Sequence, residues 1–140
     1  MKLEVKKSAL HGWGLFALEE IPWGTRIIEY KGEVISDAVA EERIARGADC
    51  IFEARSGENI DGTVNGNEAR YVNHARRKPN CFILREEGKI WMVAGIEGIE
   101  QGEELTFDYG SGYYPRRVRR EAGRCLATSS SALSGSSPSR

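Results

Sequence analysis

The chain has 140 residues, of which 40% are hydrophobic and 29% are charged, and its formal net charge is −1. This length fits one compact domain with one hydrophobic core, and the composition is ordinary for a soluble globular protein. No apolar run approaches the roughly 20 residues of a membrane helix, and the N-terminus lacks the apolar segment and cleavage site of a signal peptide. We therefore expect a soluble intracellular protein.

The charge is unevenly distributed along the chain. Residues 1–115 hold 14 Lys and Arg against 20 Asp and Glu, a net charge of −6, whereas residues 116–140 hold six against one, a net charge of +5. An acidic body attracts a cationic partner. Acidic surfaces also simply keep proteins soluble, and the composition does not choose between these two explanations.

Short runs of β-branched and aromatic residues between frequent glycines predict strands at residues 25–30, 50–54, 80–85 and 89–94. Residues 37–47 form the best helix candidate. Asp37 could cap its N-terminus, early acids suit the helix dipole, and Gly47 could end it. The predicted fold class is mainly β (α+β), with many short strands, one short helix and long loops.

The end of the chain has a different composition. Residues 116–125 are basic, and residues 126–140 are rich in serine and cannot bury enough apolar surface to repay chain entropy, so we expect disorder there. The predicted organisation is a domain at 1–115, a basic segment and a disordered tail. The basic segment could bind nucleic acid, but we favour a solvated chain end.

Three cysteines, Cys50, Cys81 and Cys125, are far apart, and none belongs to a C-x-x-C pair. They cannot form a four-cysteine zinc site within one chain. We therefore predict no bound metal.

Four segments carry unusual residue content. "HGWGLFA" (residues 11–17) flanks Trp13 with glycines, which would let the backbone approach a ligand, although a turn beside a core Trp is more common. "EYKGE" (29–33) contains Tyr30. "GEELTFDYG" (102–110) places Phe107 and Tyr109 at a strand end, with Tyr113 and Tyr114 close behind. These rings could close a core or form a narrow slot that favours an ammonium group by cation–π attraction.

The fourth segment, "NGNEARYVNHARRKPNC" (65–81), contains the pair Asn73-His74. The chain holds only two histidines, so this placement calls for an explanation. On the residues alone the pair could bind a ligand, act as a catalytic base, bind a metal or cap a strand end.

In this order along the chain, the four segments resemble the SET domain, the family of S-adenosylmethionine-dependent protein lysine methyltransferases. The resemblance covers residues 8–114, and its last two segments are highly specific in combination. It implies a SET-domain fold, with several small β-sheets around a pseudoknot in which the C-terminal segment passes through a loop, an exception to the usual absence of knots.

The resemblance also implies roles for individual residues. Those expected to bind S-adenosylmethionine, which becomes S-adenosylhomocysteine, are Gly12, Trp13, Gly14, Arg70, Asn73 and His74. Tyr109 matches the family's essential catalytic tyrosine. The channel for the substrate lysine would be lined by Tyr30, Phe52, Phe107 and Tyr113. A phenylalanine at 107 implies room for more than one methyl group, and hence a di- or trimethyl product.

The implied chemistry is methyl transfer from a sulfonium to a neutral amine. A lysine with a pKa near 10.4 must first lose its proton. An aromatic channel and the nearby sulfonium charge both disfavour the ammonium and lower that pKa. Tyr109 would aim the amine, so that most of the acceleration would come from positioning.

The sequence departs from the family pattern at several positions. Ala75 and Arg76 stand where many members have Ser and a zinc-binding Cys, and only Cys125 remains downstream. We therefore predict no zinc cluster after the domain. Tyr113, Tyr114 and the basic run, or a second copy of the chain as a homodimer, could close the site instead. Cys50 also replaces a tyrosine common in the family.

Two rival functions remain alongside the methyltransferase. One is a catalytically inactive SET-like module that binds a peptide or cofactor, and the other is a nucleic-acid binder acting through the basic run. The acidic body suits a basic protein substrate, such as a histone or histone-like protein. The expected location is cytoplasmic or nucleoid-associated, or nuclear in a eukaryote, without contact with a membrane.

Overall fold

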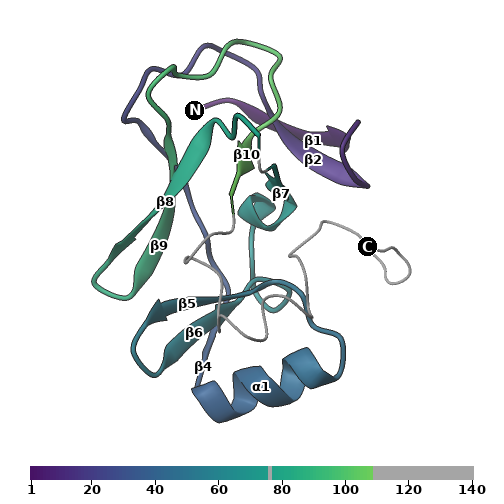
Figure 1. Ribbon diagram of the computed structural model, residues 1–140, viewed down its shortest axis with the longest axis vertical. Coiled ribbons are helices and arrows are strands. Elements are labelled where there is room, and N and C mark those ends of the chain that lie inside the picture. The colour runs from purple at the N-terminus through teal and green to yellow at the C-terminus, as the bar shows by residue number, and fades with distance from the viewer. Residues whose placement is uncertain (76, 109–140) are drawn as a thin grey trace.

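The computed structural model describes residues 1–75 and 77–108 (Figure 1). The predictions for residues 109–140 lie outside this part. They include Tyr109 and Tyr113, the boundaries at 115 and 125, and the segment that would complete the pseudoknot.

The described residues form three small sheets. In the first, β1 (Leu3–Lys7) pairs antiparallel with β2 (Trp13–Ala17). The second has the strand order β3 (Arg26–Glu29), β9 (Lys89–Ala94), β8 (Cys81–Glu86), β10 (Thr106–Phe107) and β7 (Asn73–His74). The third has the order β4 (Glu33–Ile35), β6 (Glu58–Asp61) and β5 (Ile51–Arg55).

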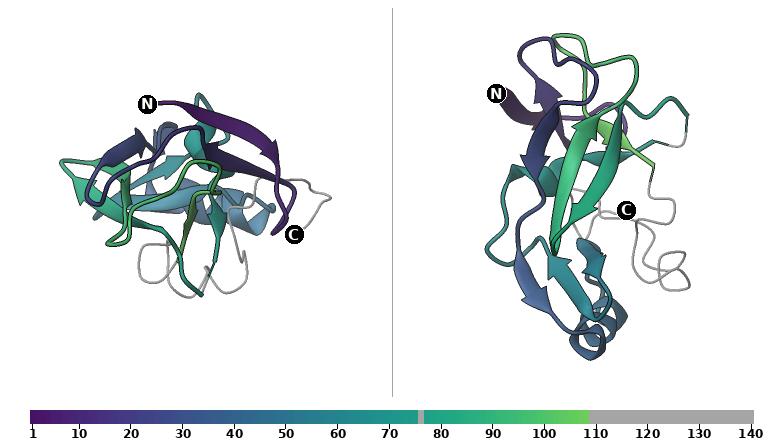
Figure 2. Two further views of the ribbon diagram at one scale, coloured as in Figure 1. Left: turned by 90° about the horizontal axis from the view of Figure 1, so that it is seen from above. Right: turned by 90° about the vertical axis from the view of Figure 1, so that its left-hand side faces the viewer.

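The third sheet and helix α1 (Asp37–Ala45) form one end of the elongated molecule, and the 3₁₀ helix η1 (Glu68–Tyr71) follows the third sheet along the chain (Figures 1 and 2). All four predicted strands are confirmed within one or two residues, as is the mainly β fold class with a single α-helix in the described part. The helix is confirmed, but its predicted N-cap is wrong. Ser36, not Asp37, is the cap, because the Ser36 Oγ accepts the Val39 N–H at 3.2 Å.

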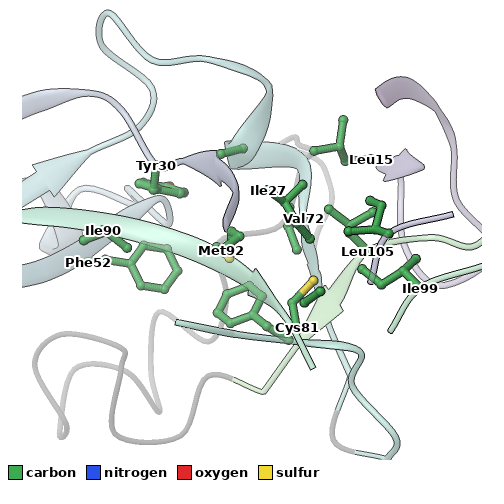
Figure 3. Packing of buried hydrophobic residues seen from close by; sticks show 14 of the residues in the cluster. Leu15, Ile27, Tyr30, Phe52, Val72, Cys81, Ile90, Met92, Ile99 and Leu105 are labelled. Atoms are coloured by element: carbon green, nitrogen blue, oxygen red, sulfur yellow. The ribbon is translucent and has the colours of Figure 1, made fainter. Parts of the chain in front are cut away.

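The main hydrophobic core lies between the sheets (Figure 3). Tyr30, Phe52 and Ile90 fill one end of it, Leu15 and Leu105 fill the other, and Met92 and Cys81 lie between them. A smaller cluster of Ile35, Ala40 and Ile51 packs beneath α1. No helix within 1–75 and 77–108 is long and apolar enough to cross a lipid bilayer.

Strand β10 brings two of the sequence motifs together. It runs parallel to both of its neighbours, with Phe107 opposite His74 of β7 and Cys81 of β8. Asn80 holds β10 from the side, because its Oδ1 accepts the Thr106 N–H at 2.8 Å and its Nδ2 donates to the Glu104 carbonyl at 2.8 Å. The segments around residues 73–81 and 104–107 thus meet at one place in the fold.

Candidate functional site

Asn73 joins three segments that are far apart in the sequence. It lies on β7 and is only 1% exposed. Its Nδ2 donates to the carbonyl oxygens of His11 at 3.0 Å and Trp13 at 2.9 Å, and to Glu104 Oε2 at 2.8 Å. The predicted glycine–tryptophan loop and the Asn-His pair are therefore in direct contact.

The Asn73 Oδ1 atom is buried and has no hydrogen-bond partner among the described residues. The amide cannot simply rotate to relieve this, because its oxygen would then face the three acceptors that now bind the nitrogen. A buried acceptor without a partner is costly in a folded protein. The arrangement therefore suits a ligand that brings a hydrogen-bond donor to this oxygen.

Glu104 and Ser8 complete this cluster, and neither was predicted as a site residue from the sequence. The Ser8 Oγ donates to the Glu104 carboxylate, with distances of 2.8 and 2.9 Å to its two oxygens. The same Oγ accepts the backbone N–H groups of Leu10 at 2.9 Å and His11 at 3.2 Å. The only signal for Glu104 was its place in the recognised "GEELTFDYG" segment.

The glycines of the loop allow this close packing. A Cβ atom on Gly14 would overlap the Glu104 carboxylate, so a side chain there would displace it. Gly12 has φ of 48°, a left-handed conformation that glycine adopts at little cost. Trp13 is 46% exposed, and its ring does not belong to the core.

His74 follows Asn73 at the edge of the cluster. Its Nδ1 lies 4.0 Å from Asp108 Oδ1, and its backbone pairs with Phe107. No group of three or more His, Cys, Asp or Glu side chains within 1–75 and 77–108 is arranged to hold a metal.

Three of the predicted channel residues lie side by side. The rings of Tyr30 and Phe52 meet edge to face with centroids 4.9 Å apart, and those of Phe52 and Phe107 are 5.7 Å apart. The Tyr30 hydroxyl donates to the Cys50 carbonyl at 2.9 Å, and Gly62 leaves room for this ring. Phe107 lies beside His74 in the sheet, so the aromatic group adjoins the Asn73 cluster.

Arg70 takes a different position from the other predicted ligand-binding residues. It lies in η1, where its guanidinium packs over the Tyr71 ring and donates to the Tyr71 hydroxyl at 2.7 Å. With the loop at residues 62–68 it lines an open pocket of about 460 Å³. Neither Asn73 nor Trp13 lines that pocket.

Cys81 is a buried free thiol opposite Phe107. Burial raises the pKa of this thiol to about 12, although a hydrogen bond from the Thr106 backbone opposes the shift. At neutral pH it is therefore protonated. Since the thiolate is the nucleophile, Cys81 is not an activated one.

A protein-family model described as the SET domain matches residues 12–110. This match covers most of the chain. The chain therefore belongs to the SET-domain family, and its fold is the SET-domain fold.

Two relatives show how much of this chain, and how much of each relative, the sequence similarity covers. The chain is 40% identical over 112 residues to a histone-lysine N-methyltransferase, H3 lysine-4 specific, of Chaetomium globosum, covering 74% of this chain and 10% of the relative. It is 38% identical over 113 residues to human histone-lysine N-methyltransferase 2B, covering 75% and 4%. The chain thus spans a tenth or less of the length of these two relatives.

The chain is also similar to solved structures over most of its length. A humanized mutant of the Chaetomium thermophilum Polycomb Repressive Complex 2, bound to the inhibitor GSK126, superposes with a TM-score of 0.70 at 35% identity, over 85% of this chain and 16% of that one. A structure of the same type of complex in an autoinhibited conformation, bound to S-adenosylmethionine, gives 0.69 at 30% identity, over 86% and 16%.

Proposed function

We propose that this chain is an S-adenosylmethionine-dependent protein lysine methyltransferase. The observation that carries the proposal is the Asn73 amide, which is fixed by the His11 and Trp13 carbonyls. Its buried oxygen has no partner among residues 1–75 and 77–108 and lies beside a group of aromatic rings. Relatives named histone-lysine N-methyltransferases and a similar structure bound to S-adenosylmethionine support it.

The residues around Asn73 fit the amino-acid end of S-adenosylmethionine. The ammonium of that end is a strong donor, and Asn73 Oδ1 is a buried acceptor that lacks one. Other residues proposed to hold the cofactor are Gly12, Trp13, Gly14, Arg70 and His74. The bound cofactor would supply the methyl group from its sulfonium, and no metal is part of the proposal.

The aromatic group fits the side chain of the substrate lysine. Tyr30, Phe52 and Phe107 are each 1% exposed and form a buried apolar group, against which an ammonium would be poorly solvated. The pKa of the lysine would therefore fall, and the reactive neutral amine would form. Tyr109 and Tyr113 are proposed to complete the channel. Tyr109 would orient the amine and help to exclude water, which acts mainly through positioning.

We propose a basic protein substrate of the histone or histone-like kind. The net charge of −6 over residues 1–115 favours encounter with a cationic peptide. Such a substrate would place the protein at a nucleoid or, in a eukaryote, in the nucleus. Closure of the site by a second copy of the chain remains part of the proposal.

A methylation assay tests this function. The purified chain, mixed with histones or a Lys-rich lysate and S-adenosylmethionine labelled in its methyl group, is expected to transfer label to protein. Tyr109→Phe should reduce the rate by about 100-fold or more, the scale of effect expected when a reacting group is mispositioned. Trp23→Phe, on an exposed ring outside the site, serves as the control.

The outcomes of this assay separate the rival functions. Cofactor binding without transfer to any protein would instead favour an inactive SET-like module. Salt-sensitive DNA binding that is lost on deletion of residues 116–140, without transfer, would favour a nucleic-acid binder.

The degree of methylation follows from Phe107. In this proposal a phenylalanine leaves room for a second and third methyl group, so mass spectrometry at saturating cofactor should show di- or trimethyl-lysine. Phe107→Tyr adds a hydroxyl to the group of rings and should shift the product toward monomethyl-lysine. A wild-type product that stops at one methyl group would contradict this assignment.

A further inference from the structure

Glu104 has no role in the proposal so far, yet it connects the parts of the cofactor site. Its carboxylate accepts hydrogen bonds from Asn73 Nδ2 at 2.8 Å and from Ser8 Oγ at 2.8 and 2.9 Å. These partners are 31 and 96 residues away in the sequence. A carboxylate that joins two such distant segments beside a candidate ligand site calls for a functional explanation.

The carboxylate fixes the orientation of the Asn73 amide. The Nδ2 group has two hydrogens and three acceptors, of which Glu104 is the only charged one. Hydrogen bonds to an ionised acceptor are roughly twice as strong as neutral ones. Because successive hydrogen bonds polarise one another, a charged acceptor on the nitrogen also makes Oδ1 a better acceptor on the other side.

The same carboxylate fixes the loop that carries the other two acceptors. Ser8 donates its hydroxyl hydrogen to Glu104, and its oxygen then accepts the N–H groups of Leu10 and His11. The Ser8 N–H donates to the Gly12 carbonyl at 2.8 Å, which closes this turn. The positions of the His11 and Trp13 carbonyls therefore depend on where Glu104 holds Ser8.

We propose that Glu104 is a positioning residue for the amino-acid end of S-adenosylmethionine and acts through Asn73. It keeps Asn73 Oδ1 directed at the cofactor's ammonium. Gly14 is needed for this arrangement, since only the absence of a Cβ leaves space for the carboxylate. This inference rests on the proposed function, because it assumes that the cofactor lies against Asn73.

Two ligands distinguish this role from simple structural support. S-adenosylmethionine and S-adenosylhomocysteine carry the amino-acid end, whereas 5′-methylthioadenosine lacks it and keeps the adenosine. If Glu104 acts on the ammonium through Asn73, its loss affects only the first two ligands. If Glu104 merely supports the fold of the loop, all three ligands lose affinity together.

Isothermal titration calorimetry with the full chain measures these affinities. Glu104→Gln should weaken S-adenosylhomocysteine binding by about tenfold or more, the scale of a hydrogen bond to a charged group, and leave 5′-methylthioadenosine within about twofold. Gly14→Ala should also weaken S-adenosylhomocysteine binding, because it displaces the Glu104 carboxylate without removing any donor or acceptor. Its added Cβ would displace the Glu104 carboxylate and would lie 3.2 Å from the Ser8 Cβ.

Two further variants complete the design. Glu103→Gln is the matched control, since Glu103 is the neighbouring exposed acid. Among the described residues, its side chain bonds only within its own turn, to the Glu100 N–H at 2.7 Å. In an Asn73→Ala background, Glu104→Gln should have a much smaller effect than in wild type, because the main residue through which it acts is gone.

The possible results are distinct. Equal weakening of all three ligands, or wild-type affinity in Glu104→Gln, would overturn the role of Glu104, and so would full additivity with Asn73→Ala. If the wild-type chain binds none of the three ligands, the proposed function fails and the inference fails with it. Binding and methyl transfer by wild type, with an unaffected Glu104→Gln, would leave the function standing and reject only the inference.

Discussion

At the scale of single residues, polar side chains rather than hydrophobic ones join the segments of the candidate site. Asn73 donates to the His11 carbonyl before β2 and to the Trp13 carbonyl at the start of that strand. Asn80 accepts the Thr106 N–H of β10 and donates to the Glu104 carbonyl just before that strand. Both are asparagines, whose amides can both donate and accept hydrogen bonds. One such residue can therefore replace several backbone pairings where the strands are only two residues long.

Cys81 gives a residue-scale prediction about pH. Its pKa is 9.0 when unperturbed and about 12 when buried in the fold. Because the pKa of this thiol is higher in the folded chain than in the unfolded chain, the thiol contributes to the stability of the fold. This contribution is complete below pH 9 and is lost as pH rises toward 12. Above pH 9 the unfolded chain releases this proton and the folded chain keeps it, so stability should fall by up to about 1.4 kcal/mol per pH unit from this group.

The measurement compares wild type with Cys81→Ala in urea, under reducing conditions, at pH 8 and pH 10. The substitution removes buried volume and lowers stability at both pH values, but it also removes the titration. The stability difference between the two proteins should therefore shrink at pH 10. Parallel pH profiles would show that this thiol does not titrate differently in the folded chain.

At the scale of elements, the most regular segments were the most predictable. The strands β8 and β9 carry β-branched and aromatic residues in sufficient length, and α1 has acids early and a glycine just after its end. Strand β1 was not predicted, because its charged residues do not suggest a strand until β2 pairs with it. Strands β7 and β10 have two residues each, and only the tertiary fold creates them.

Some residues of the candidate site were predictable from the sequence, and others were not. Family resemblance pointed to Trp13, Asn73 and several aromatic residues. The described part of the chain brings Trp13 to Asn73, and Tyr30, Phe52 and Phe107 to one another. Ser8 and Glu104 were missed, because their partnership spans 96 residues and both residue types are common on protein surfaces. Sequence reading cannot detect a contact that exists only when β2 and the segment before β10 lie side by side.

The capping of α1 gives an element-scale prediction. Ser36 has φ of −76° and ψ of 170°, and its Oγ accepts an N–H group that would otherwise be unsatisfied. Ser36→Ala should destabilise the protein by about 1 kcal/mol, whereas Ser36→Asp should retain most of the stability because Asp is also a good cap. Urea unfolding measures both.

The control for this prediction is Ser56→Ala, an exposed serine in the turn between β5 and β6. It should leave the unfolding midpoint unchanged. A loss as large at Ser56 as at Ser36, or a loss at Ser36 that Asp does not restore, would show that the cap has no special contribution.

At the scale of the whole molecule, we expect stability and ligand affinity to depend on different parts of the fold. The third sheet and α1 form one end with their own small core, and the β1–β2 pair lies toward the other (Figure 1). The candidate site lies between them, where β7 and β10 adjoin the main core. Substitutions beneath α1 and substitutions around Asn73 should therefore affect different properties, stability in the first case and ligand affinity in the second.

The parallel insertion of β10 between β7 and β8 also has a consequence for synthesis on the ribosome. Asn73 is made 31 residues before Glu104, which takes about 2 to 6 s at ordinary elongation rates. During that interval the amide lacks its charged partner and β7 lacks its neighbouring strand. We therefore expect a nascent chain to gain affinity for the proposed cofactor only after Glu104 has emerged. Ligand binding would then follow completion of the fold and would not guide its early steps.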